Sequence, residues 1–87
     1  MRRQDYYEDG FLVKKGERYV ESVIPNGHPE KPVIYWTENE NNALAFRRYT
    51  AAEMRAMQLD AKVVSFRTED RGRGRMPKRI ITGELVV

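Results

Sequence analysis

Cysteine is absent from this 87-residue chain, and histidine occurs only once. Without cysteine the chain has no disulfides, thiolate nucleophiles or thiolate zinc sites, so its stability must come from packing or from oligomerisation. The one histidine, His28, lies between Gly27 and Pro29, and the chain contains no Gly-x-Ser-x-Gly motif. Since no acid, base and nucleophile can be assembled, we expect a protein that is not an enzyme and has no cofactor.

Long apolar segments are also missing. No stretch approaches the roughly 18 apolar residues that span a bilayer, and the first seven residues lack the apolar segment of a signal peptide. Two pairs of neighbouring carboxylates, Glu38 with Glu40 and Glu69 with Asp70, are few for a metal site, and the first pair suits the first turn of a helix. We therefore expect a cytoplasmic protein with no membrane contact and no bound metal.

The length fits a single small domain over residues 1–87, with residues 1–9 as a polar leader. Apolar and β-branched runs predict strands at 11–15, 19–24, 33–36, 61–66 and 79–87, and Gly16 marks a hairpin turn between the first two. Three prolines in residues 25–32 predict a loop. The capping-box patterns that begin at Thr37 and Thr50 predict short helices over about 38–47 and 51–59.

These elements predict an α+β fold, in which a mostly antiparallel sheet of about five strands carries two short helices packed on one face. Trp36 follows three other apolar residues at the end of the third strand, so we expect it at the centre of the core. The predicted core consists of Phe11, Val13, Val20, Ile34, Trp36, Ala43, Phe46, Ala52, Leu59, Val64, Phe66 and Ile81.

Positive charge is concentrated in residues 67–79, between the fourth and fifth predicted strands. This segment has six cations and two acids, a net charge of +4, whereas the whole chain is +3 and the other 74 residues sum to −1. Because arginine offers a fixed fork of donors to anionic oxygens, we predict a basic hairpin tip that contacts phosphate or an acidic partner. A solvated tip that only keeps a sheet edge soluble is the alternative. The cations are Arg67, Arg71, Arg73, Arg75, Lys78 and Arg79.

Four further residues are candidates for contact. Arg47 and Arg48 lie at the end of the first predicted helix, where they either complement the helix dipole or extend the basic surface. Tyr6 and Tyr7 lie in the polar leader, where exposed rings can stack on bases or anchor a protein interface.

Residues 11–64 contain a strand pair around Gly16, the run Val33-Ile34-Tyr35-Trp36-Thr37, Ala43 with Phe46, and Ala52 with Ala56 before Lys62-Val63-Val64. This order resembles small uncharacterised proteins of bacteriophages and prophages. The resemblance rests on core and cap positions over about 60% of the chain and has no counterpart for residues 67–79. It implies a small accessory protein that acts by binding host machinery, and it implies no catalytic residue.

We therefore expect a non-enzymatic phage-type accessory protein that binds a macromolecular complex of host or phage and modulates it, by inhibition, through the basic hairpin and exposed aromatic residues. The alternative is a direct nucleic-acid-binding protein in which the segment from Arg67 to Arg79 contacts phosphates. Oligomeric state is left open by the sequence, and formation of a homo-oligomer is compatible with it.

Overall fold

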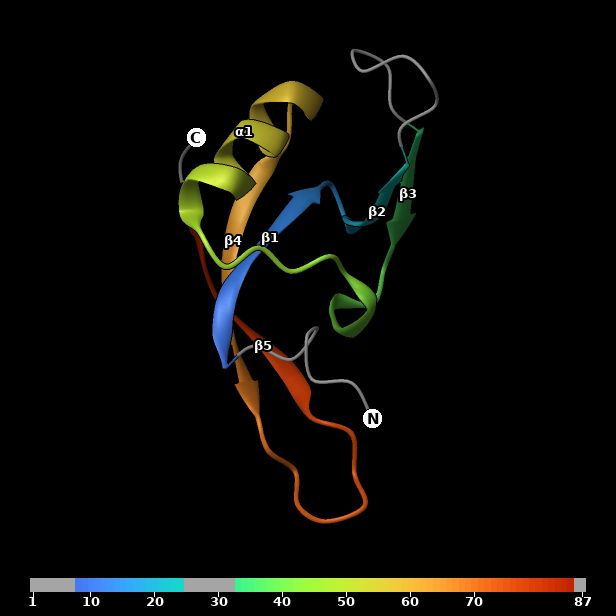
Figure 1. The fold of residues 1–87 in the computed structure, drawn as a ribbon, viewed down its shortest axis with the longest axis vertical. Coiled ribbons are helices and arrows are strands. Elements are labelled where there is room, and N and C mark those ends of the chain that lie inside the picture. The colour runs from blue at the N-terminus through green and yellow to red at the C-terminus, as the bar shows by residue number, and fades with distance from the viewer. Residues whose placement is uncertain (1–7, 25–32, 86–87) are drawn as a thin grey trace.

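The computed structural model describes residues 8–24 and 33–85 of the chain. The predicted loop at 25–32, most of the predicted leader and the last two residues lie outside this range. Within it, five strands, one 3₁₀ turn and one α-helix follow one another along the chain (Figure 1). They are β1 (Asp9–Lys15), β2 (Arg18–Ile24), β3 (Val33–Thr37), η1 (Glu40–Asn42), α1 (Tyr49–Leu59), β4 (Lys62–Glu69) and β5 (Lys78–Leu85).

The five strands form one antiparallel sheet in the order β3-β2-β1-β4-β5, which confirms the predicted five-stranded antiparallel sheet. Gly16, with φ of 62°, lies in the turn between β1 and β2, where its left-handed backbone is freely adopted because it has no Cβ. β1 and β4 pair along six residues, whereas β1 and β2 pair only at Lys14↔Tyr19 and Lys15↔Arg18, beside their turn.

The prediction of two helices is wrong for the first of them, because residues 38–47 form only the short turn η1. The side chain of Asn39, not of Thr37, caps this turn by accepting from the amide of Asn41. The amide of Leu44 donates to the carbonyl of Val20 at 2.9 Å, and Phe46 exchanges two backbone hydrogen bonds with Phe11, each 2.8 Å. These bonds to β1 and β2 use the backbone groups that a helix would need, so the segment stays extended.

Residues 44–46 thus lie between the parts of β1 and β2 that do not pair with each other. Figure 1 shows this segment, in light green, passing across β1 towards α1. Gly10 at the start of β1 permits the crossing: a Cβ at this residue would lie 2.8 Å from the carbonyl oxygen of Phe46 and 3.1 Å from the ring of Phe66. The chain therefore needs glycine here for a close approach between two backbones.

The second predicted helix is confirmed as α1, although it starts at Tyr49 and Thr50 does not cap it. Its N-cap is Arg48, whose side chain makes no capping hydrogen bond. At the other end Asp60 adopts a left-handed conformation, with φ of 55°, and the amide of Ala61 donates to the carbonyl of Ala56 at 2.8 Å. This closing bond is of the Schellman type, which ends a helix by satisfying carbonyls of its last turn.

The core is divided between the two faces of the sheet, because neighbouring residues of a strand point to opposite sides. Ala52 and Ala56 of α1 pack with Val13, Val20 and Val63 on one face. Ala43, which follows η1, packs with Leu12, Tyr19, Val64 and Phe66 on the other. One face of the sheet is therefore covered by α1, and the other face is covered by the segment around η1, where the first helix was predicted.

Half of the predicted core is buried, namely Val13, Val20, Ala43, Ala52, Val64 and Phe66. The other half surrounds these residues and is only partly buried, namely Phe11, Ile34, Trp36, Phe46, Leu59 and Ile81. The prediction of Trp36 as the centre of the core is wrong, because β3 is an edge strand and its residues have neighbours on one side only. Leu12 and Val63 are buried core residues that the prediction omitted.

Candidate functional site

The basic segment forms the tip of the hairpin that joins β4 to β5. The two strands remain paired as far as Glu69↔Lys78, and residues 70–77 form the tip. The side chain of Asp70 accepts from the amide of Gly72 at 2.9 Å, and the amide of Arg75 donates to the carbonyl of Gly72 at 3.2 Å. Gly72 and Gly74 both have positive φ, of 101° and 78°. The chain reverses in a turn held by a backbone hydrogen bond and by the side chain of Asp70, and the arginine side chains are not used to build it.

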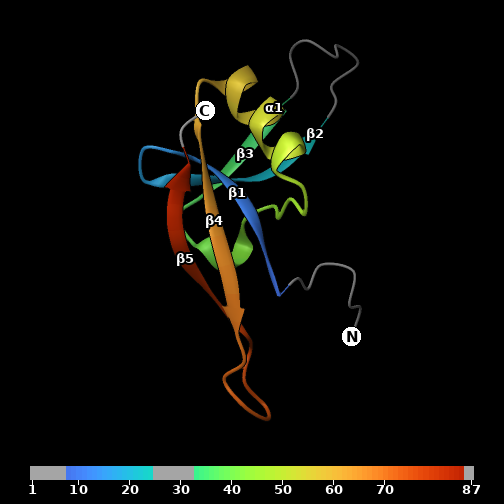
Figure 2. The ribbon, with the colours of Figure 1, turned by 90° about the vertical axis from the view of Figure 1, so that its left-hand side faces the viewer.

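The tip projects from the body of the protein. In Figures 1 and 2 it lies at one end of the long axis, in orange, while α1 lies towards the other end. Arg71, Arg73 and Arg75 are exposed, and none of them forms an ion pair or hydrogen bond through its side chain with another described residue. Arg67 and Lys78 are exposed on the adjoining strand ends. Arg71, Arg73 and Arg75 are therefore brought together on one projecting turn, with Lys78 at the start of β5 and Arg67 further down β4, where it pairs with Asp9 of β1; we call residues 67–78 the basic tip.

The sixth cation of the segment, Arg79, has a different environment. Its guanidinium donates to the carbonyls of Ala43, at 2.6 Å, and Glu40, at 3.1 Å, and lies 5.0 Å from the centre of the Phe66 ring. Its backbone amide donates to the side chain of Asn41 at 2.8 Å. Arg79 therefore fixes the η1 segment to β5, a role that the charge pattern of the sequence does not reveal.

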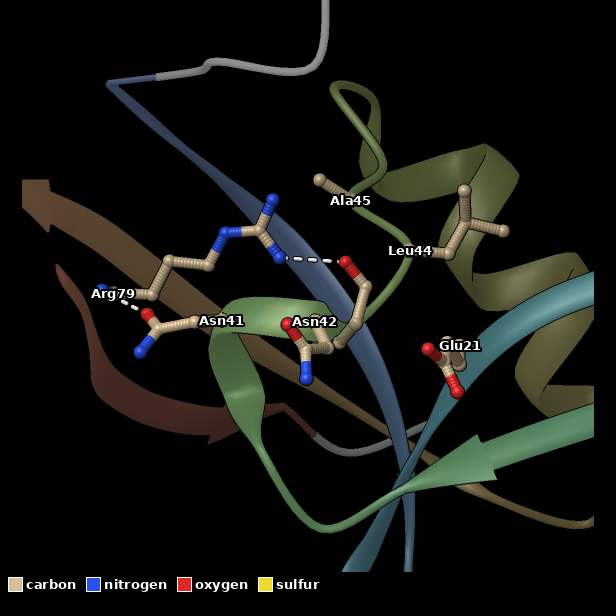
Figure 3. A pocket seen from close by; sticks show the side chains of 7 residues that line it. Glu21, Asn41, Asn42, Leu44, Ala45 and Arg79 are labelled. Carbon is tan, nitrogen blue, oxygen red and sulfur yellow. Dashed lines mark hydrogen bonds between the residues drawn. The ribbon is translucent and has the colours of Figure 1, made fainter. Parts of the chain in front are cut away.

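A pocket of about 310 Å³ lies beside this junction (Figure 3). Figure 3 shows Arg79 reaching across one side of the pocket towards the backbone after Asn42, with Glu21 on a separate strand. The polar groups around Arg79 are already bonded to one another, so we interpret the pocket as a feature of the junction between η1 and β5. Its lining consists of Glu21, Asn41, Asn42, Ala43, Leu44, Ala45 and Arg79.

Arg47 and Arg48 are exposed, but they lie immediately before α1 and not at the end of a helix. The prediction that they lie at the end of a helix is wrong, because residues 38–47 do not form one. Figure 1 places the start of α1 far from the basic tip along the long axis, so the two arginines do not extend that surface. Tyr6, Tyr7 and His28 lie outside the described residues.

Exposed apolar side chains are the feature that the sequence analysis missed. Met76, within the basic tip, is 74% exposed, and Met54 and Met57 on the outer side of α1 are 72% and 67% exposed. A helical-wheel comparison could have found the last two, because Ala52 and Ala56 define the buried stripe and both methionines fall outside it. Tyr35, on edge strand β3, is 51% exposed, so it is a further aromatic candidate for partner contact that the sequence analysis did not include.

No group of three or more histidine, cysteine, aspartate or glutamate side chains within 8–24 and 33–85 is arranged to hold a metal ion. In the same part of the chain, no helix is both long enough and apolar enough to cross a membrane. Comparisons with models of protein families, with curated proteins and with solved structures find no match to this chain. The candidate site therefore has to be interpreted from its own geometry.

Proposed function

We propose that this chain is a non-enzymatic accessory protein, of the phage type that its sequence resembles, and that its basic tip binds nucleic acid through the phosphates. The observation that supports this proposal is the set of exposed cations on a projecting two-stranded ribbon, with Arg71, Arg73 and Arg75 unpaired among the described residues. Cations without protein partners can replace the counterions of phosphates without first breaking an internal ion pair.

The turn favours a duplex over a single strand as the target. An extended segment would place Arg71, Arg73 and Arg75 in a row about 7 Å apart, a spacing suited to one phosphate chain. The hydrogen bond from Arg75 to Gly72 instead closes a turn, so these arginines gather around the end of the ribbon. A two-stranded ribbon fits the major groove of B-form DNA, where phosphates of both strands flank the ribbon.

The test is a titration by fluorescence anisotropy against duplex DNA, single-stranded DNA and RNA at two salt concentrations. In the variant R71S/R73S/R75S, affinity for duplexes of different sequence should fall to a similar degree. The slope of log affinity against log salt should shrink by up to about three units, since each lost phosphate contact removes about 0.9. Absence of wild-type binding near physiological salt would eliminate the proposal.

A matched control removes the same charge from other parts of the surface. Arg18, Arg48 and Lys62 are exposed and lie outside the tip, and Arg18 and Lys62 form only exposed ion pairs, with Glu38 and Glu84. Such pairs contribute little to stability, so R18S/R48S/K62S should fold like the tip variant. If this control reduced duplex affinity as strongly as the tip variant, binding would depend on net charge and not on the hairpin.

Binding of a protein complex of host or phage, with inhibition of that complex, is the second candidate function. Met76 favours it, because an apolar side chain that is 74% exposed among cations can anchor a protein interface. M76Q separates the two functions. Duplex affinity carried by phosphate contacts should change less than twofold in this variant, whereas loss of an interface anchor should weaken a protein complex tenfold or more.

A further inference from the structure

The outer side of α1 carries a shallow apolar groove of about 770 Å³. Met54 and Met57 are two of its walls, and both are largely exposed, whereas the residues that α1 buries are the small Ala52 and Ala56. A helix that only covers a sheet would place its large apolar residues inside and polar residues outside. The lining consists of Phe46, Ala51, Met54, Arg55, Met57 and Gln58.

Among the residues that the structure describes, the one charged residue in the lining of this groove is a cation, Arg55. Arg55 lies in its lining and donates to the side chain of Gln58, while Arg47 and Arg48 separate Phe46 from the helix in the chain. The one acid within α1, Glu53, is half-buried and accepts from the hydroxyl of Tyr49 at 3.3 Å, so it is not part of the groove. Apolar walls beside cations fit a ligand that combines apolar side chains with carboxylates.

We propose that the outer side of α1 is a docking surface for an acidic amphipathic helix of a partner protein, with its apolar stripe on Met54 and Met57 and its carboxylates beside Arg48 and Arg55. A helix is the occupant that fits, because Met54 and Met57 are three residues apart and form a ridge along α1 on which a second helix can pack. Methionine side chains adapt to such partners, since they are unbranched and polarisable.

A second copy of this chain does not fit the groove in a symmetric dimer. In such a dimer α1 would face α1, so Arg55, which lies near the middle of the helix, would approach Arg55 of the other copy at an electrostatic cost. The groove also differs from the basic tip in position, because Figures 1 and 2 place α1 and the tip towards opposite ends of the long axis. Binding at α1 is therefore independent of the proposed nucleic-acid contact, and both could occur at once.

The test uses three labelled 18-residue peptides with the same length and leucine content. One has leucines at helical spacing with glutamates between them, the second has lysine in place of each glutamate, and the third is a scrambled version of the first. Fluorescence anisotropy should detect binding of the acidic amphipathic peptide, with at least tenfold weaker binding of the other two. Equal binding of the scrambled or lysine peptide, or no binding of the acidic one, would overturn the proposal.

Variants locate the site. M54Q/M57Q should lower the affinity for the acidic peptide at least tenfold. R48S/R55S should lower this affinity several-fold and make it less dependent on salt. M76Q is the matched control, because Met76 is as exposed as Met54 but lies in the basic tip, and it should leave the affinity unchanged. Glutamine is a good helix former, so M54Q/M57Q should remain folded.

Methyl resonances give a second readout that does not depend on affinity. On addition of the acidic peptide, the methyl signals of Met54 and Met57 should shift while the signal of Met76 stays in place. A shift confined to Met76 would overturn the proposal. Sedimentation of the protein alone is the remaining check: a dimer that disappears in M54Q/M57Q would assign the groove to a second copy and overturn the proposed partner.

Discussion

Replacement of Gly10 by alanine tests the crossing of residues 44–46 beside β1, which is the least expected feature of this fold. Gly10 is buried, and a Cβ there would lie 2.8 Å from the carbonyl oxygen of Phe46 and 3.1 and 3.3 Å from two ring carbons of Phe66. A contact under 3.0 Å with a backbone atom cannot be relieved by rotating a side chain. The crossing segment must therefore move away from β1, or the strand must move.

The cost can be estimated from what that movement disturbs. Overfilling a packed site costs about 1–3 kcal/mol. Weakening the two 2.8 Å hydrogen bonds between Phe11 and Phe46 adds about 1 kcal/mol or more. Alanine also reduces the conformational entropy of the unfolded chain, which offsets this cost by about 0.4–1 kcal/mol. We expect G10A to lower the free energy of unfolding by about 1–4 kcal/mol, which for a domain of this size lowers Tm by about 4 °C or more.

Gly83 provides the matched control, because it also lies within a strand and its φ is not positive. A Cβ at Gly83 would lie 3.7 Å from the hydroxyl of Ser65, which is an ordinary contact. G83A should therefore change the free energy of unfolding by less than about 1 kcal/mol. Urea unfolding of both variants, followed by the fluorescence of Trp36 and by far-ultraviolet circular dichroism, makes the comparison. Equal stability of G10A and G83A would refute the crossing of the two backbones at Gly10.

Two further predictions concern Arg79 and the phenol of Tyr19. R79A should lower the free energy of unfolding by about 2–3 kcal/mol, since it removes charged donors from two carbonyls beside η1, while R75A should change it by less than about 0.5 kcal/mol in the same urea experiment. Burial, followed by the charges of Glu40 and Glu17, raises the pKa of Tyr19 above its ordinary value. The unfolded chain therefore loses this proton first, so the stabilisation is complete below about pH 10 and is lost as the pH rises further. Unfolding curves measured from pH 8 to 11 should show a smaller loss of stability with rising pH in Y19F than in wild type. An identical loss in both would contradict the raised pKa of Tyr19.

The sequence alone determined the strands, the one α-helix and the place of the basic tip. Each depends on local information: apolar runs and Gly16 for the hairpin of β1 and β2, the helix-start pattern at Thr50 for α1, although Thr50 does not cap it, and the cluster of cations between two predicted strands for the basic tip. Local signals suffice for α1 and for the two hairpin turns, because their backbone hydrogen bonds close within the element or with the next strand, whereas the six-residue pairing of β1 with β4 is decided by the tertiary structure.

Only the tertiary structure decided the course of residues 38–48 and the roles that follow from it. The pattern from Thr37 to Glu40 is a valid helix start, yet Asn39 caps only a short turn, because the amides of Leu44 and Phe46 find carbonyls on β2 and β1. That competition involves residues more than twenty positions away, so no local pattern can record it. The same distance hides the contact of Arg79 with the η1 segment. Trp36 is half-buried because the order of the strands, which is also decided by distant residues, places β3 at the edge of the sheet.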